Sequence, residues 1–175
     1  WHYGRIELAP AHASLTLPSR FRFVPGNRLH RLARLRSQPL DPSVLGWVSH
    51  ETVDLGRPTA WALEVRFVAS GHLRAEVGAD SELAFAEALP ALGGAPSLDG
   101  SGRSLGNGAY APRWDPTRQL LTWSLDAPEG SSEQRAVLPL RHGALLFVLR
   151  GVEPDQREFA LRATRLMAAS VEVQP

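Results

Sequence analysis

The sequence contains no cysteine, no lysine and no long hydrophobic run. Without cysteine the chain cannot form a disulfide, a thiolate nucleophile or a cysteine-based zinc site. The longest uninterrupted apolar run, residues 144–149, is far shorter than the roughly 20 residues that a membrane-spanning helix requires. No internal repeat of fixed period is found. The 175 residues therefore predict one globular domain spanning 1–175.

All 19 basic residues are arginine, and they are unevenly distributed. No acidic residue lies between Glu7 and Asp41, and that stretch contains Arg20, Arg22, Arg28, Arg31, Arg34 and Arg36. The use of arginine in place of lysine has two interpretations. It reflects either selection for bidentate anion recognition or the codon bias of a GC-rich genome. The net charge of +1 and the lack of a recognition motif argue against a dedicated nucleic-acid binder.

Alternation of apolar and polar residues predicts a series of strands. The clearest is 61–67, in which every second residue from Trp61 to Phe67 is apolar and large. Other strand-like segments are 13–17, 21–24, 46–48, 72–77, 109–113, 119–125, 135–140, 144–149 and 171–173. Short links and the absence of a strand–helix rhythm predict a largely antiparallel, or mixed, sheet of about six to nine short strands.

About three helices are expected to pack on this sheet, which makes the predicted fold a single-domain α+β structure. The first spans about residues 28–36, with Asn27 as its N-cap and its apolar side formed by Leu29, Leu32 and Ala33. The second begins at Asp80 or Ser81 and ends near residue 89.

The third expected helix begins at Pro154 and ends near residue 169. Its apolar residues Phe159, Ala163 and Leu166 are expected to face inward. Glu158 and Arg162 are expected to form an outward pair on its opposite side.

Residues 93–108 include six glycines and predict a flexible loop. The glycine spacing does not match a dinucleotide-binding fingerprint, and a phosphate-binding loop would require a lysine that the chain lacks. We therefore expect no nucleotide site in this segment.

Motifs for nucleophilic catalysis and metal binding are absent from the sequence. The six histidines are scattered and no two are four residues apart on a predicted helix. No catalytic residue, metal ligand or cofactor is predicted. An enzyme would have to assemble its site from dispersed residues such as Asp115, Arg141 and His142.

Two groups of residues are candidates for binding instead. Arg28, Arg31 and Arg34 would form a basic side of the first helix, suited to an anionic membrane surface or an acidic envelope partner, or simply exposed to solvent. The segment 110–116 combines Arg113, Trp114 and Asp115 with two prolines, and it predicts either a rigid structural corner or the rim of a ligand site.

The order of several short motifs resembles an uncharacterised bacterial family described as predicted membrane-anchored proteins of unknown function. The motifs are Leu17-Pro18, Phe21-Arg22-Phe23, Gly46-Trp47-Val48, Trp61, Pro112-Arg113-Trp114-Asp115, Leu121-Thr122-Trp123 and Arg141-His142-Gly143. The sequence departs from the family pattern after the first helix, where Arg36-Ser-Gln-Pro39 replaces Gly-Asn-Pro-Pro, and before Arg141, where a glycine is missing.

The resemblance implies an export signal and a C-terminal membrane anchor in the full-length protein, and so a location in the periplasm or cell envelope. It implies no catalytic residues. We therefore expect a binding or interaction module of the envelope, with Arg28, Arg31, Arg34, Arg113, Trp114, Asp115, Arg141 and His142 as candidate binding residues. The alternatives are a hydrolase-like enzyme and a non-catalytic structural spacer. The oligomeric state is left open.

Overall fold

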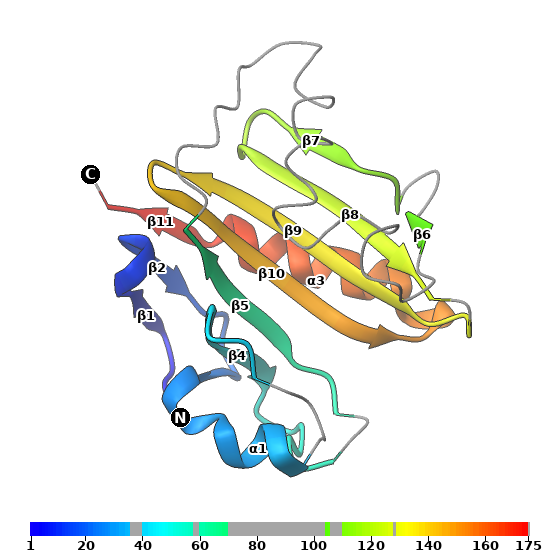
Figure 1. The fold of residues 1–175 in the computed structure, drawn as a ribbon, viewed down its shortest axis with the longest axis horizontal. Helices are drawn as coiled ribbons and strands as arrows, with labels where there is room; N and C mark the ends of the chain where they lie inside the picture. The colour runs from blue at the N-terminus through cyan, green and yellow to red at the C-terminus, as the bar shows by residue number, and fades with distance from the viewer. Residues whose placement is uncertain (36–39, 58–59, 70–103, 106–109, 128, 175) are drawn as a thin grey trace.

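The computed structural model describes residues 1–35, 40–57, 60–69, 104–105, 110–127 and 129–174. The strands in these ranges form two antiparallel sheets (Figure 1). The strands of the large sheet are β3 (Phe21–Pro25), β4 (Val44–His50), β5 (Leu63–Val68), β6 (Ser104–Leu105), β7 (Arg113–Asp115), β8 (Leu120–Asp126), β9 (Ser132–Leu140) and β10 (Gly143–Val152). The strands of the small sheet are β1 (Arg5–Leu8), β2 (Ala13–Thr16) and β11 (Val171–Val173).

The α+β class is confirmed, and every strand pairing among the described residues is antiparallel. These residues contain eleven strands, more than expected, and two α-helices, α1 (His30–Leu35) and α3 (Arg157–Ala169), fewer than expected. Short 3-10 turns occur at η1 (Ala9–Ala11), η2 (Gly26–Arg28) and η4 (Pro154–Gln156). The expected strand 72–77 and the expected helix near 80–89 lie outside the described residues.

The large sheet has the strand order β3-β4-β5-β10-β9-β8-β6, and β7 also pairs with β8. Its centre is the β9–β10 hairpin, which turns at Arg141 and His142 and pairs residues of β10 with β9 from Gly143 to Val152. Strand β10 is buried on both faces from 143 to 149, which explains why this segment is a continuous apolar run instead of an alternating one.

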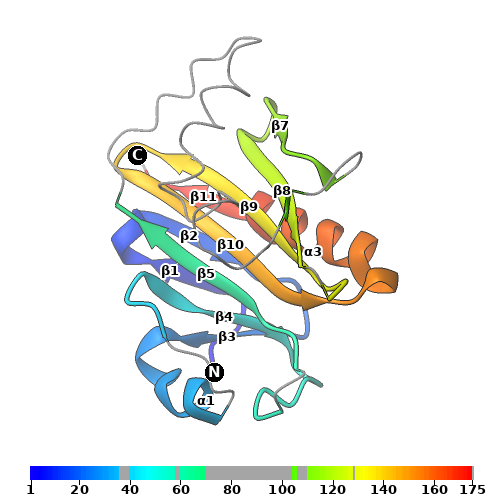
Figure 2. The same ribbon diagram turned by 45° about the vertical axis from the view of Figure 1, so that its right-hand side comes forward.

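One face of the large sheet is covered by the small sheet and by α3, which lie on the same side of it (Figures 1 and 2). The main core fills the space between these layers. It includes Leu15 from the small sheet, Leu63, Val65 and Phe147 from the large sheet, and Met167 from α3. The alternating strand predicted at 61–67 is confirmed, because Leu63 and Val65 point into this core and Trp61 and Phe67 pack against it.

A second cluster lies beside α1, where Leu29, Val44 and the fully buried Trp47 pack together with Leu32 against them. Leu29, Leu32 and Ala33 therefore face inward as predicted. The helix is shorter than expected, since Asn27 lies in η2 and α1 begins at His30.

Helix α3 faces the core with a different side from the one predicted. Its buried residues are Ala160, Leu161, Thr164, Met167 and Ala168. Phe159 and Leu166, which were expected to face inward, are 61% and 58% exposed. The prediction for these two side chains is wrong. The outward Glu158–Arg162 pair is confirmed, with Arg162 Nη2 3.3 Å from Glu158 Oε1.

The glycine-rich segment 93–108 is not wholly a loop. Ser104 and Leu105 form β6, which pairs with Asp126 and Leu125 of β8. The rest of this segment lies outside the described residues. The expected strand 109–113 is shifted along the chain, because β7 comprises Arg113, Trp114 and Asp115.

Candidate functional site

A groove of about 660 Å³ lies between the β7–β8 hairpin and helix α3, which lines it from Glu158 to Ala169, and we call it the α3 groove. Its apolar lining includes Leu120 from β8 and Leu161 and Leu166 from α3. Its charged lining consists of Arg113, Asp115, Arg118, Glu158, Arg162 and Arg165. Arg113 and Asp115 lie on the same face of β7, because they are two residues apart in a strand. They pair with Thr122 and Leu120 of β8.

Arg165 lies deepest among these cations and makes hydrogen bonds to a hydroxyl group alone. Its Nε and Nη2 atoms donate to Thr122 Oγ1 at 3.3 and 3.1 Å. Burial lowers the pKa of Arg165, and the positive charge of Arg113 lowers it further, while Asp115 opposes both. Within the described part of the chain, neither Arg165 nor Arg113 forms an ion pair with a carboxylate.

Asp115 does not neutralise these two arginines, because its carboxylate is engaged in the β7–β8 turn. Its Oδ1 accepts hydrogen bonds from the backbone N–H of Thr117 (3.0 Å) and Arg118 (3.1 Å), and its Oδ2 pairs with Arg118 Nη1 (2.9 Å). These bonds, the Arg118 side chain first, hold the pKa of Asp115 below its ordinary value. These bonds form an Asx-type turn at Asp115.

Arg157 lies two turns before Arg165 on α3, and it forms an ion pair, whereas Arg165 forms none with a described carboxylate. Arg157 Nη2 contacts Asp126 of β8 at 2.5 Å and Ser124 Oγ at 3.2 Å, and its guanidinium stacks on the Tyr110 ring at 4.2 Å. Arg157 is thus neutralised by the same strand that offers Arg165 only Thr122. Among the described residues, Arg165 near the C-terminal end of α3 thus has no carboxylate partner, whereas Arg157 at the start of the helix has one.

The α3 groove has four arginines and two acidic residues in its lining. Arg118 is paired with Asp115, and the exposed Arg162 with Glu158. The excess is therefore carried by Arg113 and Arg165, whose planar guanidinium groups suit carboxylate, sulfate or phosphate oxygens. With leucines beside them, these groups can bind an anion attached to an apolar body.

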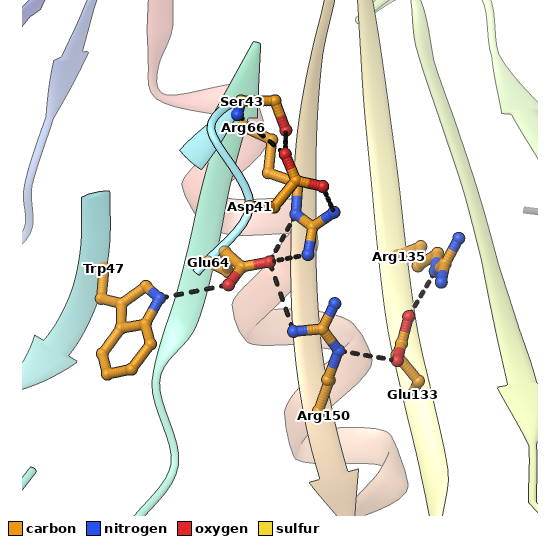
Figure 3. A network of polar contacts seen from close by, with 8 residues as sticks. All are labelled: Asp41, Ser43, Trp47, Glu64, Arg66, Glu133, Arg135 and Arg150. Atoms are coloured by element: carbon orange, nitrogen blue, oxygen red, sulfur yellow. Dashed lines mark hydrogen bonds and ion pairs between the residues drawn. The ribbon is translucent and has the colours of Figure 1, made fainter. Parts of the chain in front are cut away.

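A second polar cluster, in which arginines and carboxylates alternate, lies on the opposite face of the large sheet (Figure 3). Glu64 of β5 accepts hydrogen bonds from Trp47 Nε1 (3.2 Å), Arg150 Nη1 (3.3 Å) and Arg66. Arg150 also donates from Nε to Glu133 at 3.1 Å.

Arg135 and Asp41 complete this network, since Arg135 pairs with Glu133 and Arg66 Nη1 lies 3.2 Å from Asp41 Oδ2. Burial lowers the pKa of Arg135, and the neighbouring Glu133 opposes this effect. Among the described residues of this network, each of the three arginines has at least one carboxylate partner. Its role is to join β5, β10 and β9 across one sheet face.

Asp41 gives this network a predicted pH dependence. Hydrogen bonds from the Ser43 side chain and backbone N–H hold the pKa of Asp41 below its ordinary value of 3.8. The folded state thus binds this proton less tightly than the unfolded state, so the contribution of Asp41 to stability is present above pH 3.8 and is lost as the pH falls through the folded-state pKa.

We expect Asp41→Asn to destabilise the protein at neutral pH, with a difference from the unmodified protein that shrinks below pH 3.8. Urea unfolding at a series of pH values measures this difference. A difference that stays constant down to the lowest pH would contradict the assignment. Asp54→Asn, which removes an exposed carboxylate beside Arg57, is the control.

The candidate binding residues are distributed over three places. Arg113, Trp114 and Asp115 line the α3 groove. Arg141 and His142 line a separate cavity of about 220 Å³ beside η1 and β11. Asp115 therefore lies in a different pocket from Arg141 and His142, so neither of these two pockets brings together the three residues that an enzyme would require.

Arg28, Arg31 and Arg34 lie on η2 and α1 and are exposed. Among the residues that the structure describes, none of the three forms an ion pair. Arg20 pairs with Glu51 at 2.7 Å, and Arg22 stacks on Trp1 at 3.7 Å, while Arg36 is outside the described residues. The basic cluster expected from the sequence is thus reduced to these three arginines, which we call the α1 patch.

Sequence reasoning missed Arg165 and Thr122, because the wrong side of α3 was assigned to the core. A usable signal was present: Arg157, Leu161 and Arg165 are four residues apart and therefore share one side of a helix. Trp114, which was selected from the sequence, packs against the buried cluster on the other sheet face around Trp123, and its part in binding stays a prediction.

Within the described ranges, no group of three His, Asp or Glu side chains is arranged to hold a metal ion. No described helix is both long and apolar enough to cross a membrane.

No protein-family model and no curated protein matches this sequence, so the family resemblance stays a prediction. Among solved structures, the chain is similar to the solution structure of CyanoP, the cyanobacterial PsbP of Synechocystis sp. PCC 6803. The TM-score is 0.54 at 12% identity, over 97% of this chain and 91% of that one. It also matches the crystal structure of LpqN, involved in cell envelope biogenesis of Mycobacterium tuberculosis, with a TM-score of 0.44 at 10% identity, over 93% and 83% of the two chains.

Proposed function

We propose that this domain is a binding module that recognises an anionic group in the α3 groove. The observation that carries the proposal is the pair Arg113 and Arg165, which line the same groove and form no ion pair with a carboxylate of the described residues. Holding like charges together in a partly buried place is unfavourable, and a bound oxyanion between them would relieve that cost. Thr122 keeps the Arg165 guanidinium fixed in orientation.

Recognition accounts for the groove better than catalysis does. Among the described residues of its lining there is no histidine, and both carboxylates are engaged by arginines, Asp115 by Arg118 and Glu158 by Arg162. A general base would need a free lone pair within hydrogen-bonding reach of a substrate. The residues present instead supply charge, hydrogen-bond donors and apolar contact.

We further propose that the module acts outside the cytoplasm, in the cell envelope, as part of a membrane-anchored protein. The support for this location is the sequence resemblance described above. Fusion of the full-length protein to a reporter that is active only outside the cytoplasm would test it. Activity only in a cytoplasmic reporter would contradict this part of the proposal.

The anion site is tested by titrating phenyl phosphate into isotopically labelled protein at constant ionic strength and following the arginine Nε–H signals by NMR. We expect the signals of Arg113 and Arg165 to shift. Arg165→Gln should weaken binding about 10- to 100-fold, since a hydrogen bond to a charged group contributes about 1.5–3 kcal/mol. Arg31→Gln, which removes an exposed helical arginine outside the groove, should leave the affinity unchanged.

The α1 patch is a second candidate site, favoured by three exposed arginines that have no described ion-pair partner. It would attach the domain to an anionic membrane surface or to an acidic partner. Sedimentation with phosphatidylglycerol vesicles tests it, because Arg31→Glu combined with Arg34→Glu should abolish binding there and leave the phenyl phosphate titration unchanged. If phenyl phosphate shifts no arginine signal and vesicles bind no protein, the spacer alternative is favoured.

A further inference from the structure

The outer side of α3 is apolar as well as its buried side. Phe159 and Leu166 are large side chains that stand exposed on a helix whose core contacts are made by other residues. Ala163 lies between them, so the three occupy positions i, i+4 and i+7 and form one stripe, which we call the outer stripe. The described core contacts of α3 are made by the other side of the helix, so the outer stripe is not needed to pack α3 on the described part of the sheet.

The outer stripe is continuous with the α3 groove, because Leu166 belongs to both. Phe159 and Leu166 are seven residues apart, which corresponds to about 10 Å along a helix. This is the length of about three residues of an extended peptide. A small anion bound between Arg113 and Arg165 would leave most of this surface uncovered, whereas a polypeptide segment could cover the groove and the outer stripe together.

The charges around the outer stripe favour a protein over a lipid surface. The groove contains Arg113 and Arg165, which form no ion pair with a described carboxylate, and Arg165 is partly buried there, where a flat bilayer cannot reach it. At the other end of the stripe, Glu158 and the exposed Asp155 of η4 carry negative charge, which would repel anionic headgroups. The surface therefore presents apolar contacts beside recessed positive charge.

We propose that the α3 groove and the outer stripe together dock a protein segment that carries carboxylates next to apolar side chains. A carboxylate of the segment would enter the groove and accept hydrogen bonds from Arg113 and Arg165. Its apolar residues would cover Leu166 and Phe159. This inference rests on the proposed anion site and adds the class of partner that occupies it.

The test is selection of a phage-displayed library of random dodecapeptides on the intact domain, with counter-selection on a Phe159→Gln, Arg165→Gln double variant. We expect enriched sequences to combine Asp or Glu with Leu, Ile, Val or aromatic residues. Failure to enrich any sequence over the double variant would overturn the inference. So would enrichment of acidic sequences that lack apolar residues.

A peptide synthesised from the enriched sequences then separates this inference from the anion site itself. Phe159→Gln should weaken the peptide about 10-fold and leave phenyl phosphate unaffected, because Phe159 is not part of the groove. Arg165→Gln should weaken both. A control peptide with Asn and Gln in place of Asp and Glu should bind at least 10-fold more weakly than the acidic one.

Each outcome has a distinct meaning. If phenyl phosphate binds but Phe159→Gln does not change peptide affinity, the anion site stands and the docking inference fails. If neither ligand depends on Arg165, both fail. If phosphatidylglycerol vesicles bind in a way that Phe159→Gln abolishes, the outer stripe contacts membrane, and the proposed protein partner is wrong. Matching thermal unfolding curves of the variants and the unmodified domain establish that a loss of binding is not a loss of folding.

Discussion

Glu64→Gln is expected to lower the free energy of unfolding by about 3–5 kcal/mol, since breaking a buried ion pair leaves the remaining charge uncompensated. Glu64 is 4% exposed and accepts hydrogen bonds from Trp47, Arg66 and Arg150. The substitution keeps the size of the side chain but removes its charge, so the two guanidinium groups lose a counter-ion in a poorly hydrated place. Urea denaturation measures the effect.

Two further variants identify the cause. Glu158→Gln removes the charge of an exposed pair on α3 and should change stability by less than about 0.5 kcal/mol. Adding Arg150→Gln to Glu64→Gln should cost less than the sum of the two single substitutions, because they act on one network. If the costs of Glu64→Gln and Arg150→Gln simply add, or if Glu158→Gln costs as much as Glu64→Gln, the network does not stabilise the sheet in the way described.

Phe147→Ala is expected to destabilise the fold by about 3–5 kcal/mol, the usual cost of removing a buried phenyl ring. Phe147 is fully buried on β10, opposite Val65 of β5 and Ala136 of β9. Its ring fills the main core between the large sheet and the layer of α3 and the small sheet, so the surrounding strands cannot easily close the cavity that it leaves. The shift of the thermal midpoint gives the size of the effect.

The chain provides a matched control at Phe159, which is 61% exposed. Phe159→Ala should change stability by no more than about 0.5 kcal/mol, although it deletes the same atoms. A large loss at Phe159 would mean that its ring packs against the fold after all. The comparison therefore also tests the assignment of the outer stripe as a surface without a role in folding.

The strands were predicted best where their two faces differ. Residues 61–67 alternate because β5 has the main core on one side and the polar network of Glu64 and Arg66 on the other. Where both faces are buried, as along β10, the pattern becomes a plain apolar run that marks a strand without identifying its partners. Neither pattern predicts that the strands divide into two sheets, because the small sheet depends on the pairing of β2 with β11, which are far apart in the sequence.

The side of α3 that packs on the sheet could not be read from hydrophobicity alone. Its buried side includes Ala160, Thr164 and Ala168, whose hydrophobicity is small, while the larger Phe159 and Leu166 lie outside. Thr164 is accommodated because its hydroxyl donates to the Ala160 carbonyl oxygen at 2.8 Å. A hydrophobicity pattern assigns the largest apolar side chains of a helix to the core. Here α3 lies close to the sheet, so small side chains also occupy buried positions.

The candidate site was half predicted. Arg113, Trp114 and Asp115 are consecutive, so an unusual local sequence was enough to find them. Arg165 and Thr122 are 43 positions apart and meet only because α3 folds back over β8. No spacing rule within one element can find such a pair, because its members belong to different elements brought together by the tertiary fold.

The small sheet has a consequence for synthesis on the ribosome. Strand β2 is made directly after β1, which is already available to pair with Ala13–Thr16. Its other edge stays unpaired until Val171–Val173 have been made, after the described strands of the large sheet. While those strands are being made, the nascent chain exposes an open strand edge, a form prone to mispairing with other chains.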